Sequence, residues 1–264
     1  VVAGGEGVYL IDTDGKRYLD ASGGAAVSCL GHGDKDVIEA IKAQLDTMAF
    51  AHTGFFTSEP SETLADLLIE AAPDGIGAVY FVSGGSEAIE AALKMARQYF
   101  VEIGELKRSK FIARHQSYHG NTLGALSVGG NVARREPFKE LLMDVADIAP
   151  CYPYRDRRDD ESEEEYGLRV ANELETEIQR LGAENVCAFV AETVGGATAG
   201  VLPPVTGYLK RIRDICNAHG ILLILDEVMC GMGRTGHTFA CAEDRVVPDL
   251  IAVAKGLGAG YQPI

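Results

Sequence analysis

The chain contains 264 residues, of which 47% are hydrophobic and 24% charged, and its 39 acidic against 24 basic side chains give a net charge of −15. This length accommodates one large domain with a sizeable core, and the hydrophobic content excludes a disordered chain. The acidic balance argues against a nucleic-acid partner, and no apolar run reaches the length of a membrane span. Six cysteines without a CxxC pair, and the lack of a basic-then-apolar leader, indicate free thiols in a reducing compartment. We therefore expect a cytoplasmic protein without nucleic-acid or membrane partners.

The first 50 residues have a pattern of their own. Two short apolar runs, Val8–Ile11 and Tyr18–Leu19, flank the turn-forming residues Asp12–Gly15, which predicts a small hairpin. A helix is predicted over Lys35–Met48. Far along the chain, Asp156–Glu165 carries seven acids in ten residues, and we interpret this segment as a solvated loop without chemistry.

Beyond residue 50, short apolar runs alternate with helical patterns, which predicts an α/β fold. The apolar runs are nearly continuous, which is typical of a mostly parallel sheet covered by helices on both faces. The predicted strands are Ala78–Val82, Lys110–Ala113, Val186–Ala191, Ile221–Leu225 and Leu250–Ala254. The predicted helices begin near Ser86 and cover Arg169–Leu181 and Tyr208–His219, the last of them ended by Gly220.

The sequence Ser83-Gly84-Gly85-Ser86-Glu87 lies between a predicted strand and a predicted helix. Glycines allow close approach of a ligand, and a helix N-terminus offers unpaired N–H groups to an anion, so a phosphate site is one interpretation. The segment is equally compatible with a tight turn that Ser86 caps. It also resembles, imperfectly, the nucleophile elbow G-x-S-x-G of serine hydrolases, with Ala88 in place of the last glycine.

Charged residues follow two further strands. Asp226 ends a buried strand at the edge where open α/β sheets bind ligands, and it could pair with a protonated heterocycle nitrogen or simply cap a turn. No P-loop sequence occurs, so we expect neither a nucleotide-bound Mg²⁺ nor another metal site. Lys255 follows the last strand, and burial there would make its amine nucleophilic enough for Schiff-base chemistry, although a strand-end lysine more commonly reaches to water.

The remaining strand ends add Tyr118-His119, whose aromatic ring could stack on a flat cofactor, and Glu192. In chain order, the strand ends therefore supply a phosphate-binding turn, an aromatic ring, a glutamate, an aspartate and a lysine. This is the set that a pyridoxal-phosphate site requires.

The chain resembles the class III (omega) aminotransferases of the fold-type I pyridoxal-phosphate superfamily. The resemblance extends from Asp12–Asp20 to Tyr261–Ile264. It is most specific over Leu225–Gly236, which is followed at the family's spacing by Pro248-Asp249 and Ala254-Lys255-Gly256.

The resemblance implies a role for each of several residues. Lys255 would form the Schiff base with the cofactor, and Asp226 would pair with its pyridine nitrogen. Gly85 and Ser86 would hold its phosphate. The two faces of its ring would be covered by Tyr118 and Val228.

Further residues are placed near the cofactor or substrate by the same resemblance. His119 belongs to the cofactor site, and Glu192 matches the glutamate of the family's Glu-Pro-Val, although Thr193 replaces the proline here. Phe55 and Phe56 would line the pocket for the amino donor. Met229 occupies a position where many relatives have glutamine. In this respect the chain is similar to the branch of the family that uses omega-amino acids or amines with pyruvate.

The resemblance implies that residues 51–264 form the α/β/α large domain and residues 1–50 the N-terminal part of a small α+β domain. It also implies that the chain is truncated at both ends, that the C-terminal small domain is absent, and that this piece is itself inactive. The full-length protein would be a homodimer or a dimer of dimers.

The reaction implied is the transfer of an amino group from an omega-amino acid or amine to a keto acid such as pyruvate, in two half-reactions at Lys255. Three alternatives stay open. A decarboxylase, racemase or aminomutase would use the same cofactor, a serine hydrolase would use Ser86 with Asp226 and His237, and the chain could be a non-catalytic remnant.

Overall fold

The computed structural model describes residues 1–264. The helices and strands in chain order are β1 (Val2–Glu6), β2 (Tyr9–Asp12), β3 (Arg17–Leu19), α1 (Gly23–Ala26), α2 (Lys35–Thr47), α3 (Glu59–Ala71), α4 (Gly85–Glu102), β4 (Lys110–Arg114), α5 (Leu123–Val128), α6 (Val132–Arg135), β5 (Ala146–Ile148), α7 (Pro153–Asp156), α8 (Glu163–Leu181), β6 (Val186–Glu192), α9 (Tyr208–His219), β7 (Leu222–Asp226) and β8 (Leu250–Ala252).

A five-stranded parallel sheet in the order β5-β4-β6-β7-β8 forms the centre of the molecule. The pairing of β6 with β7 runs from Ala188 opposite Leu222 to Glu192 opposite Asp226. Since all five strands are parallel, their carboxyl ends lie at the same edge of the sheet. The register therefore places Glu192 beside Asp226 at that edge.

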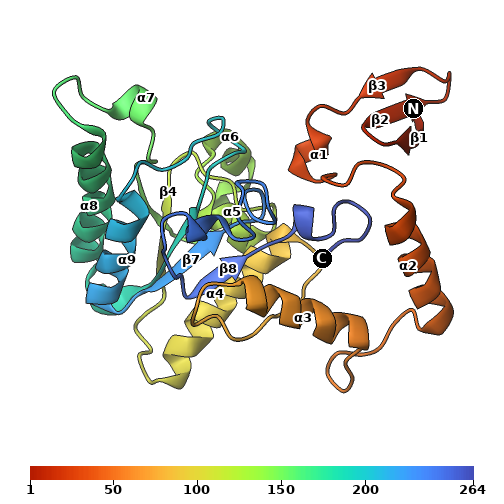
Figure 1. The fold of residues 1–264 in the computed structure, drawn as a ribbon. Coiled ribbons are helices and arrows are strands. Elements are labelled where there is room, and N and C mark those ends of the chain that lie inside the picture. Colours follow the sequence, from red (N-terminus) through yellow and green to blue (C-terminus); the bar gives the residue numbers. More distant parts are fainter.

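The sheet separates two hydrophobic cores because successive side chains of a strand point to opposite faces. On one face, Phe189 and Leu223 pack against α8 and α9. On the other face, Val190 and Ile224 pack against α4 and α5. Figure 1 shows these two pairs of helices on opposite sides of the strands. The predicted α/β/α arrangement, a mostly parallel sheet flanked by helices, is confirmed.

Most predicted elements are confirmed: four of the predicted strands occur as β4, β6, β7 and β8, and the four predicted helices occur as α2, α4, α8 and α9. The prediction of a strand at Ala78–Val82 was wrong, because this segment has no regular secondary structure. The segment and β8 line an apolar cavity of about 400 Å³ instead of pairing with each other. An apolar run indicates that its side chains will be buried, whereas a β-strand also needs a neighbouring strand with which its backbone forms hydrogen bonds. Strand β5 was missed because it has three residues with Asp147 at its centre.

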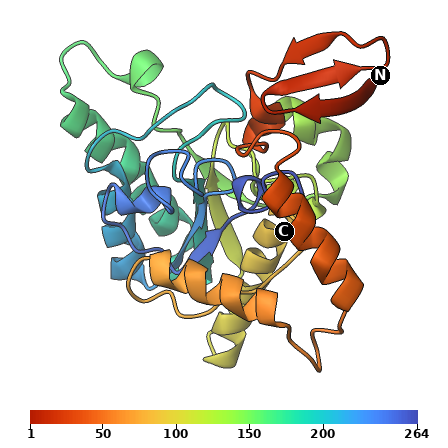
Figure 2. The ribbon, with the colours of Figure 1, turned by 45° about the vertical axis from the view of Figure 1, so that its right-hand side comes forward.

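The N-terminal segment lies to one side of the layered body, as Figures 1 and 2 show in two views. Strands β1, β2 and β3 form an antiparallel sheet, which contains the predicted hairpin and one strand more. Helix α2 runs along the outer side of the molecule, and the chain returns to the body through α3. Ala26 is the one buried residue among the first 50. The division into domains near residue 50 stays a prediction.

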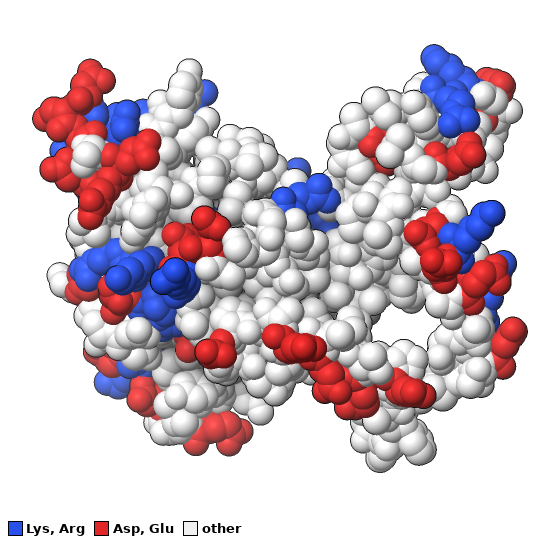
Figure 3. Space-filling view, viewed as in Figure 1, with Lys and Arg blue, Asp and Glu red and all other residues white.

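The interpretation of Asp156–Glu165 as a loop was wrong in part. Helix α8 begins at Glu163, and a capping box forms in which Ser162 accepts from the Glu165 N–H while the Glu165 carboxylate accepts from the Ser162 N–H. Three acids in the first turn face the positive end of the helix dipole, which stabilises this beginning. Figure 3 shows acidic side chains gathered over α7 and the beginning of α8. No helix of the chain combines the length and apolar character that crossing a membrane requires.

Candidate active site

A cavity of about 390 Å³ lies at the carboxyl edge of the sheet, where the loops after β4, β6, β7 and β8 meet the N-terminus of α4. It contains every residue that the sequence assigned to catalysis or cofactor binding. These residues are Gly85, Ser86, Tyr118, His119, Glu192, Asp226, Val228 and Lys255. The parallel topology explains the convergence, because residues far apart in the chain follow strands that end at one edge.

One end of the cavity is formed by the beginning of α4, an 18-residue helix. A Cβ atom on Gly85 would lie 2.8 Å from Val228 Cγ1, and one on Gly120 would lie 2.5 Å from Ser86 Oγ, so neither position has room for a side chain. The hydroxyl of Ser86 donates to Asn121 Oδ1 at 3.1 Å and accepts from the Asn121 N–H at 3.1 Å. Free backbone N–H groups and the dipole of a long helix favour an anion such as phosphate at this end.

Asp226, the last residue of β7, is 5% exposed and is held by two hydrogen bonds. Its Oδ2 lies 2.8 Å from Nδ1 of His119, and its Oδ1 accepts from the Val228 N–H at 2.9 Å. Both oxygens are therefore fixed in direction. A buried, fixed carboxylate is suited to a protonated heterocycle nitrogen.

Asp226 is the last member of a row of four buried charged or titratable side chains. In order of proximity, these are Arg114, Glu192, His119 and Asp226. Arg114 donates to the backbone oxygen of Glu192 at 2.6 Å and to its carboxylate at 3.1 Å, and the Tyr118 N–H donates to the same carboxylate at 3.0 Å. Glu192 therefore lies between two positive partners, Arg114 and a protonated His119, which favour its charged form.

The pKa values of this row are shifted accordingly. Burial alone would lower the pKa of His119, but its hydrogen bond to Asp226 and the field of Glu192 outweigh burial, and the pKa is raised. Burial alone would raise the pKa of Glu192, but the positive fields of His119 and Arg114 outweigh it, and the pKa is lowered. The two shifts favour a protonated His119, whose Nδ1 then donates to Asp226, and an ionised Glu192.

Lys255 lies three residues beyond β8 and directly after Ala254, which is buried. Its φ of 43° is in the left-handed region, which a residue with a side chain rarely adopts and which functional sites often contain. The Lys255 amine makes no hydrogen bond or ion pair within the chain, so no protein group competes for it. An amine so placed on a cavity wall can bond to an aldehyde carbon.

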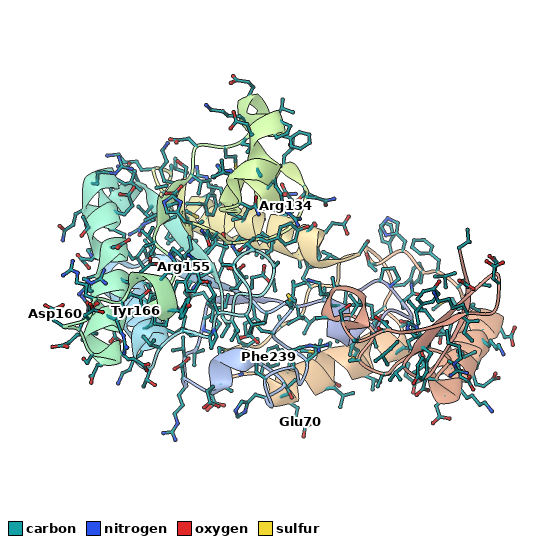
Figure 4. All side chains as sticks on the ribbon, turned by 90° about the horizontal axis from the view of Figure 1, so that it is seen from above. Glu70, Arg134, Arg155, Asp160, Tyr166 and Phe239 are labelled. Carbon is teal, nitrogen blue, oxygen red and sulfur yellow. The ribbon has the colours of Figure 1, made fainter.

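Tyr118 is itself covered on one side. The guanidinium of Arg134, labelled in Figure 4, lies over the Tyr118 ring at 4.6 Å from its centroid. This contact positions the ring by cation–π attraction. Sequence reasoning missed both Arg134 and Arg114. Arg114 carried a signal, since it directly follows the apolar run Lys110–Ala113 at a strand end.

Three residues named from the sequence lie outside the cavity. Phe55 and Phe56 are 82% and 66% exposed, and their role in a donor pocket stays a prediction. His237 is bonded to Glu243 at 2.8 Å, not to Ser86 or Asp226. The hydrolase triad of Ser86, Asp226 and His237 is therefore not assembled, and that alternative was wrong.

The residues of the cavity fit pyridoxal phosphate. Gly85 and Gly120 let Val228 and Ser86 pack closely beside a helix N-terminus that would hold a phosphate. A fixed carboxylate is available for the ring nitrogen, and an unpaired lysine is available for the aldehyde. The fold and the cavity are thus compatible with the binding of pyridoxal phosphate.

Comparisons with known proteins agree with this interpretation. Residues 1–264 match the family "Aminotransferase class-III", and the chain belongs to this family. It is 49% identical over 260 residues to an uncharacterized aminotransferase of Schizosaccharomyces pombe, a match that covers 98% of this chain and 57% of that protein. It is 37% identical over 265 residues to the putrescine–pyruvate aminotransferase of Pseudomonas aeruginosa, covering 100% of this chain and 58% of that protein.

The fold comparison gives the same family. The crystal structure of the omega transaminase from Pseudomonas jessenii in complex with PMP matches with a TM-score of 0.95 and 35% sequence identity, covering 100% of this chain and 58% of that chain. The chain thus spans little more than half the length of the relatives that it matches.

Proposed function

We propose that the protein is a pyridoxal-phosphate-dependent transaminase that moves an amino group from an omega-amino acid or amine to a keto acid such as pyruvate. The observation that carries the proposal is the meeting of Lys255, Asp226 and the N-terminus of α4 on one cavity. Support for the reaction comes from membership of the class III aminotransferases. Support for the substrates comes from the putrescine–pyruvate relative and from the omega transaminase that binds PMP, the aminated form of the cofactor.

When bound, the cofactor supplies an electron-withdrawing ring and an aldehyde carbon that exchanges an amino group. Asp226 would keep the ring nitrogen protonated, because its buried carboxylate is held in place by His119 and the Val228 N–H. A carboxylate fixed in this way would stabilise a positive charge on that nitrogen.

Lys255 has two roles in this proposal. Its amine would hold the cofactor covalently through the aldehyde carbon, and the same amine would move a proton at the substrate carbon that bears nitrogen. No side chain of the protein pairs with the Lys255 amine, which leaves it free to contact the cofactor and the substrate.

The end of α4 and the aromatic ring of Tyr118 orient the cofactor. The helix N-terminus with Ser86 would bind the phosphate, and Tyr118 and Val228, which both line the cavity, would cover the ring. Phe55 and Phe56 are proposed to contribute to the donor pocket, and the whole protein is proposed to act as a homodimer or dimer of dimers.

The covalent role of Lys255 is tested by incubating the protein with pyridoxal phosphate, reducing with borohydride and locating the adduct by peptide mass spectrometry. We expect one adduct, on Lys255, and none in Lys255→Ala. Lys210→Ala, at an exposed site on α9, is the matched control and should retain the adduct. An adduct retained in Lys255→Ala would overturn the assignment.

The reaction is tested by supplying an amine or omega-amino acid with and without pyruvate. Transamination predicts oxo product and alanine in equal amounts, and only with pyruvate present. Carbon dioxide, or an inverted or rearranged amino acid without pyruvate, would contradict transamination while leaving the cofactor assignment intact.

A further inference from the structure

Glu227 is a buried carboxylate that the proposed reaction does not use. It stands between Asp226 and Val228, both on the cofactor cavity, yet it does not line that cavity and is fully buried. Its carboxylate accepts three hydrogen bonds, from the Thr193 hydroxyl at 2.8 Å, the Ala240 N–H at 2.6 Å and the Cys241 N–H at 2.8 Å. All three donors are uncharged, so the burial of this charge depends on keeping every one of them.

The backbone of Glu227 is fixed as firmly as its side chain. Its N–H donates to the Ala252 oxygen at 2.8 Å, and its carbonyl accepts from the Gly231 N–H at 2.9 Å. Ala252 ends β8, three residues before Lys255. Glu227 thus joins the loop after β7 to the strand that delivers the lysine.

Thr193 connects the same residue to the loop after β6. Thr193 is 2% exposed. Its hydroxyl donates to Glu227, and its N–H donates to the backbone carbonyl oxygen of Asp226 at 3.2 Å. Proline, which the resemblance places at this position in relatives, has neither an N–H nor a hydroxyl. Both bonds therefore require a residue other than proline at position 193.

We propose that Glu227 is a positioning residue of the site and that the Thr193 hydroxyl completes the pairing of its carboxylate. Through these bonds the ends of β6, β7 and β8 are held together, which fixes Asp226 and Lys255 relative to each other. The inference rests on the proposed function, because the consequence of losing the bond is expressed in cofactor chemistry.

Loss of the hydroxyl leaves Oε1 of this buried carboxylate with one donor, the Cys241 N–H, in place of two, and the loop after β7 must rearrange to compensate. Asp226 lies at the beginning of that loop, so its distance from the cofactor nitrogen changes first. The phosphate end, formed by α4, is on a different element. We therefore expect the turnover number to fall while binding of the cofactor's phosphate end is preserved.

The test compares Thr193→Val, which deletes the hydroxyl at nearly constant shape, with Thr193→Ser, which retains it, in the protein loaded with pyridoxal phosphate. Thr176→Val, at an exposed position on α8, is the remote control. Thr193→Val should lower kcat about tenfold with KM for the amine within about twofold, since one hydrogen bond to a charged group is lost. Thr193→Ser and Thr176→Val should keep the kcat of the wild type.

A spectroscopic measurement separates positioning from a general loss of stability. The pH midpoint of the bound cofactor's visible absorbance depends on the carboxylate at its ring nitrogen, and it should shift by about half a unit or more in Thr193→Val. Should the valine variant not fold, Thr193→Ala gives the same comparison with Thr193→Ser, and Glu227→Gln should exceed either in its effect.

Unchanged kcat and midpoint in Thr193→Val, or equal losses in the valine and serine variants, would overturn the inference. Absence of the borohydride adduct from the wild type would instead overturn the proposed function, so the two failures are distinct.

Discussion

Nδ1 of His119 lies 2.8 Å from Oδ2 of Asp226, and both side chains are buried at the carboxyl edge of the sheet. The contact joins the loop after β4 to the end of β7, two segments 107 residues apart in the chain. Since Glu192 and Asp226 together raise the pKa of His119 against the effect of burial, the imidazole retains its proton to higher pH than in water. A charged donor thus fixes the carboxylate on which the proposed chemistry depends.

Replacing His119 by leucine should therefore slow turnover. The variant removes a hydrogen bond to a buried carboxylate, and we expect kcat to fall about 10- to 100-fold, as measured by steady-state kinetics with amine and pyruvate. His119→Asn offers a neutral donor at a similar position and should recover part of the loss. An equal decrease of kcat in His119→Leu and His119→Asn would show that hydrogen-bond donation to Asp226 is not the role of this residue.

The same pair predicts a dependence of stability on pH. A histidine whose pKa is higher in the folded than in the unfolded chain binds its proton more tightly when folded, so its stabilisation is complete below the unfolded pKa and is lost as pH rises through the folded pKa. The free energy of unfolding, measured with urea across the neutral range, should decline with this titration in the wild type. In His119→Asn that decline should be absent.

The phosphate end of the site gives a prediction about shape. Gly85→Ala would place a methyl group 2.8 Å from Val228 Cγ1, at the position where backbone approaches the proposed phosphate. We expect about tenfold weaker binding of pyridoxal phosphate, measured by fluorescence or absorbance titration. Gly4→Ala is the matched control, because an added Cβ there meets nothing within 4 Å. A Gly85→Ala variant with wild-type affinity would show that the phosphate binds elsewhere.

The ion pair of Arg114 with Glu192 should matter for stability more than exposed ion pairs do. Arg114→Met leaves the Glu192 carboxylate buried without its cation, which costs about 3–5 kcal/mol of unfolding free energy near neutral pH. The pKa of Glu192 is lowered in the folded chain, so its stabilisation is present above the unfolded pKa and is lost as pH falls through the folded pKa. The difference in unfolding free energy between the wild type and Arg114→Met should therefore become smaller as the pH is lowered.

Two controls accompany this variant. Arg180→Met breaks a pair with Glu177 on the exposed surface of α8 and should have a far smaller effect. The double variant Arg114→Met with Glu192→Leu removes both charges and should recover much of the lost stability. A single variant as stable as the wild type, or a double variant worse than the single, would contradict this account.

The sequence allowed the sheet and the principal residues of the site to be predicted, and the reason is physical. Buried parallel strands are nearly continuous apolar runs, so Asp226 and Lys255 were recognisable as charged residues at their ends. The segment Ala78–Val82 has the same composition but no paired neighbour, and composition does not specify pairing. The hydrogen bond between Thr193 and Glu227 depends on which loops come together in the fold. The local sequence around either residue does not indicate its partner, so this contact could not be predicted.

The core itself can be tested on α8, which carries a buried and an exposed leucine. Leu174 is fully buried against the sheet, whereas Leu168 on the same helix is 41% exposed. Leu174→Ala removes packed methyl groups and leaves a cavity, which should lower the unfolding free energy by about 2–5 kcal/mol. Leu168→Ala changes the same residue type in the same helix and should cost less than about 1 kcal/mol. Urea unfolding followed by far-UV circular dichroism measures both, and similar losses for the two variants would mean that α8 is not packed on the sheet in solution.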